Sequence, residues 1–280
     1  MNFLKSNYRF LALALIISFV GCDSAPTAGK QIYVSEGYSN KVVDGYWLYL
    51  PRNFDSNKKW PVILFLQGGA GVSPYPRTSK EDGPAKFALN NLSKEGKYQL
   101  VSDTFLIINP HMKVGPREKR QWYQYPNTLK SIIDEVVYKY AGDSSRIYLT
   151  GLSRGGHGSW GLAKKYPQTF AAIVPIAGQI NCRSDCEKLS EIPIWIIHNS
   201  GDPTVDFEYS LNTVDYFEKS MNRIFLKIND MKLAPTQMDS SLIFSELDKD
   251  EHDAWNLAYS SNSLYEWLLT KKIQSKADKN

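Results

Sequence analysis

The chain has 280 residues, of which 42% are hydrophobic, 13% aromatic and 22% charged. These values are typical of a globular protein and exclude disordered, collagen-like and coiled-coil chains, and the length suffices for one large domain or two small ones. The net charge is +4, and it would be +2 without Lys5 and Arg9, which lie in a segment expected to be removed. A balance this close to neutral does not indicate a nucleic-acid partner.

Residues 1–21 have the organisation of a secretory signal peptide. Lys5 and Arg9 precede an apolar run over residues 10–20. The run is about half as long as the roughly 20 residues that a membrane-spanning helix needs. We therefore expect an exported protein.

The apolar run ends in Phe19-Val20-Gly21-Cys22, which resembles the bacterial lipobox. In that motif the cysteine is lipidated and becomes the new N-terminus, although Leu is usual at the position of Phe19. Cleavage by an ordinary signal peptidase nearby is the alternative. We expect a lipoprotein anchored to a membrane through Cys22, facing the periplasm or the cell surface, with residues 22–30 as a flexible tether.

Two further cysteines, Cys182 and Cys186, are close in sequence. An even pair in an exported protein predicts a disulfide, which here would clamp one small loop. No second Cys or His pair lies nearby, so we expect no metal site at these cysteines, and the chemistry proposed below needs no cofactor.

Strand and helix patterns alternate between residues 31 and 271. Strand patterns, several of them continuous apolar runs as in strands buried on both faces, occur at Gln31–Tyr38, Gly45–Leu50, Val62–Leu66, Thr104–Asn109, Arg146–Thr150, Ala171–Ile176, Ile194–His198 and Ser241–Leu247. Helical stretches occur at Pro84–Leu92, Thr128–Tyr140, Gly156–Tyr166, Phe207–Lys219 and Ser263–Lys271. This alternation predicts one α/β domain over 31–271 with a mostly parallel, doubly wound sheet flanked by helices. Residues 272–280 form a polar tail.

Ser153 is the candidate nucleophile. The sequence Gly151-Leu-Ser-Arg-Gly155 follows the strand Arg146–Thr150 and opens the helix Gly156–Tyr166, which is the strand–turn–helix setting that the Gly-x-Ser-x-Gly motif requires. The sharp turn strains the backbone at the serine, and the two glycines leave room where side chains would collide. The serine oxygen then lies at a helix N-terminus, where oriented N–H groups favour developing negative charge.

A nucleophilic serine needs a base, and the base needs an orienting carboxylate. In hydrolases with this motif the order along the chain is Ser, acid, His. Asp202 lies just past the C-terminal end of the strand Ile194–His198, at the edge where open α/β sheets gather their active sites. Asp206 is its nearest rival, and Asp215, well into the next helix, is a distant one.

Chain order also selects the base among four histidines. His111 and His198 come too early, and His157 lies four residues past the nucleophile in the first turn of its helix. His252 follows the last strand, in a loop before the terminal helices. We therefore predict a triad of Ser153, Asp202 and His252.

A glycine-rich turn, Gln67-Gly68-Gly69-Ala70-Gly71, follows the strand Val62–Leu66. Its glycines let backbone N–H groups approach a substrate without obstruction. We predict an oxyanion hole made of the backbone N–H groups of Gly69 and Arg154. An ordinary strand-to-helix turn would need far fewer glycines.

These motifs resemble secreted α/β-hydrolase esterases of the feruloyl esterase and acetyl-xylan esterase type, whose relatives are often described as predicted peptidases or phospholipase/carboxylesterase-like proteins. The resemblance covers about residues 43–271. It is carried by Trp60-Pro-Val-Ile-Leu-Phe-Leu-Gln-Gly-Gly69, Gly151-Leu-Ser-Arg-Gly-Gly-His-Gly-Ser-Trp160, residues 166–178, residues 192–205, His252-Asp-Ala-Trp255 and Leu264-Tyr-Glu-Trp-Leu268. It implies the α/β-hydrolase fold and the same triad.

Two positions depart from the pattern of these esterases. Gln67 stands where they usually have histidine, and Asp206 stands where a proline often follows the acid segment. Because the predicted oxyanion donors are backbone groups, activity need not be lost. Trp122, in the segment after the strand that ends at Asn109, is a candidate for stacking on a sugar or aryl group, with a packed tryptophan as the equal alternative. Trp160, on the helix after the nucleophile, is expected in the core.

The sequence therefore predicts an exported serine esterase. The resemblance implies a small ester or an oligosaccharide ester as substrate, with acetyl or hydroxycinnamoyl groups on plant-type polysaccharides. A serine peptidase of the same fold is the alternative, since the same triad can cleave amides. A non-catalytic surface-binding lipoprotein is the other, although it would have no need of a complete triad.

Overall fold

The computed structural model describes residues 27–39, 41–69, 82–90, 96–113, 120–182 and 185–273. The predicted signal peptide, the lipidation site at Cys22, most of the tether and the tail from residue 274 lie outside these ranges. No helix within them is long and apolar enough to cross a membrane.

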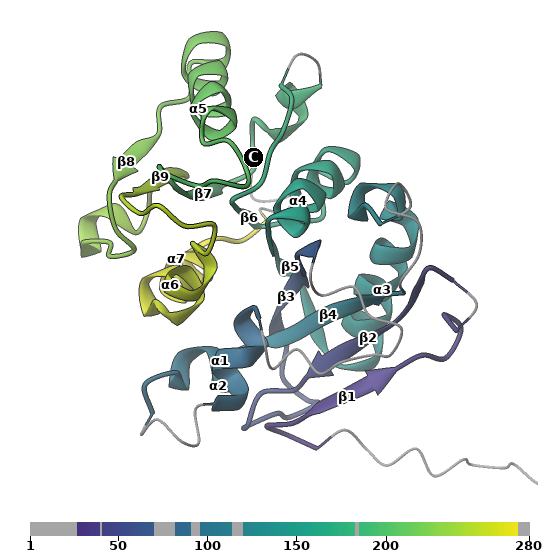
Figure 1. The fold of residues 1–280 in the computed structure, drawn as a ribbon. Coiled ribbons are helices and arrows are strands. Elements are labelled where there is room, and N and C mark those ends of the chain that lie inside the picture. The colour runs from purple at the N-terminus through teal and green to yellow at the C-terminus, as the bar shows by residue number, and fades with distance from the viewer. Residues whose placement is uncertain are drawn as a thin grey trace, which may run out of the picture.

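Within these ranges, nine strands form one sheet in the order β1-β2-β4-β3-β5-β6-β7-β9-β8 (Figure 1). The strands are β1 (Gln31–Val34), β2 (Val43–Tyr49), β3 (Trp60–Leu66), β4 (Leu106–Met112), β5 (Gly142–Leu152), β6 (Ala172–Ile176), β7 (Ile194–Asn199), β8 (Leu226–Ile228) and β9 (Leu242–Leu247). β1 and β2 pair antiparallel, β2 is antiparallel to β4, and all neighbours from β4 to β8 are parallel. The mostly parallel sheet that the sequence predicts is confirmed.

Helices cover both faces of this sheet (Figure 1). They are α1 (Pro84–Asn90), α2 (Gln99–Thr104), α3 (Pro126–Lys139), α4 (Arg154–Lys165), α5 (Glu208–Met221), α6 (Trp255–Ser260) and α7 (Asn262–Thr270). In the part of the chain that the structure describes, short 3-10 helices lie at Trp122–Gln124, Cys186–Leu189 and Pro235–Gln237. The side chains of α3, α4 and α5 contribute to one buried cluster, and those of α1, α2, α6 and α7 contribute to the other.

Strand β3 shows why the sequence is continuously apolar in the middle of the sheet. Val62, Leu64 and Leu66 belong to one buried cluster, whereas Ile63 and Phe65 belong to the other. Both faces are covered, so both sets of alternating side chains must be apolar. The turn that follows β3 therefore begins at the end of a strand buried on both faces.

Several smaller expectations are also settled by the structure. Trp160 is 1% exposed, as expected for a core residue. Cys182 and Cys186 form the predicted disulfide. β8, α2 and α6 are additional to the elements that the sequence predicts; each has six residues or fewer, too few to show a clear periodicity.

Candidate active site

Ser153 lies at the sharp turn between β5 and α4, with φ 53° and ψ −116°. A positive φ is unusual for a residue with a side chain and indicates local strain. Gly155 makes this turn possible, because a Cβ there would overlap the carbonyl oxygen of Leu66. A Cβ at Gly151 would likewise overlap the carbonyl group of Gly155. The two glycines therefore have the steric role that the motif predicts.

Asp202 lies in the turn after β7, and its carboxylate is held by several donors. Oδ1 accepts hydrogen bonds from the backbone N–H groups of Thr204 (2.7 Å) and Val205 (3.0 Å). Oδ2 lies 2.6 Å from Nδ1 of His252, which must be the donor because an ionised carboxylate can only accept. Burial acts to raise the pKa of Asp202, but the hydrogen bonds from His252, Val205 and Thr204 outweigh it, so this pKa lies below its ordinary value.

His252 lies in the loop between β9 and α6, with its side chain 21% exposed. The ring packs edge-on against Trp255, with 5.1 Å between the ring centroids. Because Nδ1–H donates to Asp202, the neutral imidazole carries its lone pair on Nε2. That nitrogen is able to accept a proton.

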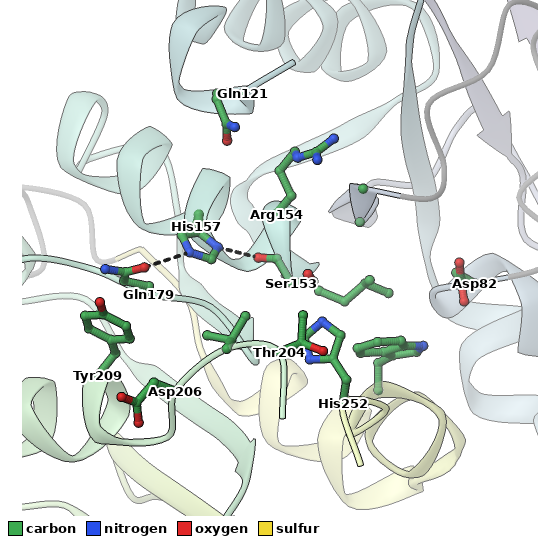
Figure 2. A pocket seen from close by; sticks show the side chains of 15 residues that line it. Asp82, Gln121, Ser153, Arg154, His157, Gln179, Thr204, Asp206, Tyr209 and His252 are labelled. Carbon is green, nitrogen blue, oxygen red and sulfur yellow. Dashed lines mark hydrogen bonds between the residues drawn. The ribbon is translucent and has the colours of Figure 1, made fainter. Parts of the chain in front are cut away.

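Ser153 and His252 line the same cavity of about 680 Å³, together with Gly69 and Arg154 (Figure 2). The elements that bring these residues together are β3, β5 and β9, whose C-terminal ends lie at one edge of the parallel sheet. The other residues that line the cavity are Gly68, Asp82, Gln121, Leu152, His157, Gln179, Thr204, Val205, Asp206, Tyr209 and Trp255. The structure thus assembles the predicted nucleophile, base and oxyanion-hole residues around one space.

The rival acids Asp206 and Asp215 have partners other than His252. Asp206 lines the cavity, but its carboxylate accepts the backbone N–H of Glu208 (3.0 Å) at the start of α5. Asp215 forms an exposed ion pair with Lys219 on α5. The geometry therefore favours Asp202 as the partner of His252.

Two histidines set aside by chain order prove to lie at the site. Nδ1 of His157 is 2.7 Å from the backbone carbonyl oxygen of Ser153, and its Nε2 is 3.4 Å from Oε1 of Gln179 (Figure 2). His198 is fully buried, and its Nε2 is 3.2 Å from Oδ2 of Asp202. The sequence feature that could have identified His198 is its position near the end of a buried strand, four residues before Asp202.

Trp122 is not a stacking surface for a ligand. It is only 1% exposed, and its indole N–H donates to the backbone carbonyl of Gln67 (2.8 Å). Its side chain also packs closely against Gly158 of α4. The expectation of substrate contact is therefore wrong, and Trp122 is a packed residue. Its hydrogen bond to Gln67 supports the turn after β3 from the protein interior.

Metal binding has no candidate in the part of the chain that the structure describes. No group of three or more His, Cys, Asp or Glu side chains there could hold a metal ion.

Comparisons with known proteins agree with this architecture. Residues 113–243 match the model of the phospholipase/carboxylesterase family. Acetylxylan esterase A of Emericella nidulans is 25% identical over 153 residues, which are 55% of this chain and 48% of that protein. Dipeptidyl-peptidase 5 of Porphyromonas gingivalis is 27% identical over 154 residues, which are 50% of this chain and 21% of that protein. The chain thus spans about half the length of the first relative and about a fifth of the second.

A solved structure extends the likeness to most of the fold. The feruloyl esterase module from Clostridium thermocellum, solved as a mutant complexed with sinapinate, superposes with a TM-score of 0.61 at 12% identity. The superposition covers 85% of this chain and 86% of the module. The chain has the α/β-hydrolase fold, and its sequence resembles esterases of that fold.

Proposed function

We propose that this α/β-hydrolase-fold protein is a serine esterase with Ser153 as nucleophile, His252 as base and Asp202 as acid. One observation carries the proposal: the 2.6 Å contact between Asp202 and Nδ1 of His252 occurs at a cavity that the strained Ser153 also lines. A packed or solvated histidine would need neither a buried carboxylate nor a serine at a sharp turn beside it.

The reaction follows from the protonation states at the site. The lowered pKa of Asp202 keeps its carboxylate ionised, so Nδ1 of His252 stays protonated and Nε2 can take the proton of the Ser153 hydroxyl. The serine oxygen attacks the ester carbonyl. The oxyanion is stabilised by the backbone N–H groups of Gly69 and Arg154, and His252 returns the proton to the leaving alcohol. Water then gives a proton to His252 and attacks the acyl carbon; the acid leaves and His252 returns the proton to the Ser153 oxygen.

For the substrate we favour acetyl or hydroxycinnamoyl esters on plant-type polysaccharides or oligosaccharides. The similarity to an acetylxylan esterase and to a feruloyl esterase module supports this class. The cavity is also lined by Gln121, Gln179 and Tyr209, whose amide and hydroxyl groups are suited to sugar hydroxyls.

The test is hydrolysis of a small panel by protein that begins at residue 23. The panel holds p-nitrophenyl acetate, methyl ferulate, acetylated xylan and a peptide p-nitroanilide. Ester turnover should disappear in Ser153→Ala and persist in Ser131→Ala, a control on the exposed side of α3. The ester that is hydrolysed fastest identifies the preferred acyl group.

A serine peptidase is the second candidate, because the matched region resembles part of a dipeptidyl-peptidase. Turnover of the p-nitroanilide above that of the esters would favour it. A binding protein without activity would hydrolyse none of these substrates and would not react with a fluorophosphonate probe.

We further propose that the protein is exported and anchored through a lipid on Cys22. The support is the cationic, apolar and lipobox-like order of residues 1–22. In a bacterial host, the full chain should incorporate labelled palmitate and sediment with membranes. Cys22→Ala should do neither, and incorporation by that variant would contradict the proposal.

A further inference from the structure

We propose that His198 is a positioning residue for the acid: its neutral imidazole donates Nε2–H to Oδ2 of Asp202 and fixes the oxygen that binds His252. The proposal rests on the proposed function in one respect, namely that Asp202 and His252 act as acid and base.

The tautomer of His198 follows from its neighbours. Nε2 lies 3.2 Å from Oδ2 of Asp202 and 3.1 Å from the backbone carbonyl oxygen of Val205. A carboxylate and a carbonyl can only accept, so Nε2 must carry the hydrogen. Asp202 and Val205, which lie in the turn after β7, share that hydrogen. The hydrogen bond therefore links this turn to His198 near the end of β7.

The charge of His198 follows from its burial. The side chain is 0% exposed, and burial lowers the pKa of His198, with the carboxylate of Asp202 opposing the effect in part. The ring is therefore neutral at pH 7, and Nδ1 accepts the hydroxyl hydrogen of Ser210 on α5 at 2.7 Å. Phe207 packs edge-on against the ring, with 5.5 Å between centroids. Only the Nε2–H group reaches Asp202, whereas Ser210 contacts the other nitrogen and Phe207 contacts one face of the ring.

A neutral donor suits this position better than a cation would. Lys or Arg beside Asp202 would largely cancel the negative charge that stabilises an imidazolium at His252. The N–H of His198 orients the oxygen and leaves that charge in place. With it, the carboxylate has four donors: the N–H groups of Thr204 and Val205 on Oδ1, and the two imidazoles on Oδ2.

Removing this donor has two consequences. Oδ2 would be held by His252 alone, and the Val205 carbonyl would lose its link to β7, so the acid turn would be less well aligned. The carboxylate would also become more basic, since a hydrogen bond to the charged form favours that form. His198, Asp202 and His252 are the titratable groups that interact with one another here.

The experiment compares His198→Leu, which has no donor, with His198→Gln, which keeps an N–H. Ser210→Ala is the matched control, because it removes the other hydrogen bond of the same ring. We would measure kcat and KM for p-nitrophenyl acetate across pH, and the low-field proton NMR resonance of the N–H between His252 and Asp202. His198→Leu should lower kcat about tenfold with KM changed less than about twofold. The acid limb of its kcat–pH profile should move to higher pH, because a more basic Asp202 carboxylate stabilises the protonated form of His252. The resonance of the N–H between His252 and Asp202 should also move.

In His198→Gln the acid limb and the resonance should return most of the way to their wild-type positions. Ser210→Ala should leave both of them in place. A merely structural role would lower the melting temperature of His198→Leu without moving either. That result, or a Gln variant as impaired as the Leu variant, would overturn the proposal. If His198→Leu does not fold, the flexible His198→Met takes its place.

The NMR measurement separates this proposal from the proposed function. If the wild-type protein hydrolyses no ester but the resonance moves in His198→Leu, the esterase assignment fails and the role of His198 stands. If esters are hydrolysed and the resonance does not move, the reverse holds.

Discussion

Replacing Asp202 by Asn tests the electrostatic arrangement of the site most sharply. Oδ1 accepts two backbone N–H groups, which cannot change, whereas Oδ2 faces two imidazoles, which can change tautomer, so the amide oxygen of an asparagine is expected on the Oδ1 side. Its NH₂ group would then face the hydrogens on Nδ1 of His252 and Nε2 of His198. The imidazole of His252 can relieve this conflict only by changing tautomer, which puts the hydrogen on Nε2 and leaves no lone pair to accept the proton of Ser153.

We expect a large loss in kcat for Asp202→Asn, because His252 can no longer act as a base although the side chain at position 202 keeps its size. For a serine triad with the wrong tautomer the loss in kcat is on the order of 10⁴, which corresponds to about 5.5 kcal/mol. The assay is kcat for p-nitrophenyl acetate at pH 7. Asp215→Asn, an exposed variant on α5, is the control and should change the rate less than about twofold. A rate for Asp202→Asn within tenfold of the wild type, in folded protein, would refute this reasoning.

Two other variants test the surroundings of the site, and a third tests an ion pair that stabilises the fold away from it. Gly155→Ala should abolish folding or activity, because its Cβ would overlap the carbonyl group at the end of β3; soluble, active protein by circular dichroism and ester assay would contradict this. Trp122→Phe removes the hydrogen bond that braces the turn after β3, so kcat should fall about fivefold at a cost of about 1 kcal/mol; a rise in KM for oligosaccharide esters alone would instead indicate substrate contact. Asp103→Asn should destabilise the fold by about 1 kcal/mol at pH 7, because hydrogen bonds from Arg52 lower the pKa of Asp103. A depressed carboxyl pKa stabilises the fold above the ordinary value and loses this effect as pH falls, so the difference in urea unfolding should shrink below about pH 4; an equal difference at pH 3 would contradict it.

The sequence predicts which residues the structure gathers at the candidate site, because strong local rules govern their positions. The glycines around Ser153 are required by contacts shorter than any side chain allows. Asp202 and His252 are selected by the chain order of hydrolases with this motif, and the pairing of β7 with β9 brings the loops after these strands together. Steric necessity and topology can both be inferred without coordinates.

Side-chain direction cannot be inferred in the same way. Trp122 follows a strand that ends at the active-site edge, yet its ring turns inward beneath the turn after β3. His198 meets Asp202 only because the chain folds back after β7, a contact that depends on the conformation of a turn. Short elements such as β8 are held by neighbouring strands rather than by their own pattern.

Trapping the acyl-enzyme tests the central claim most directly. Protein mixed with p-nitrophenyl acetate and quenched in acid within the first turnover should carry one acetyl group, located by mass spectrometry on the peptide that contains Ser153. His252→Ala should show no such adduct in the same time. An acetyl group on another residue, or equal labelling of Ser153 without His252, would contradict a mechanism in which His252 activates this serine.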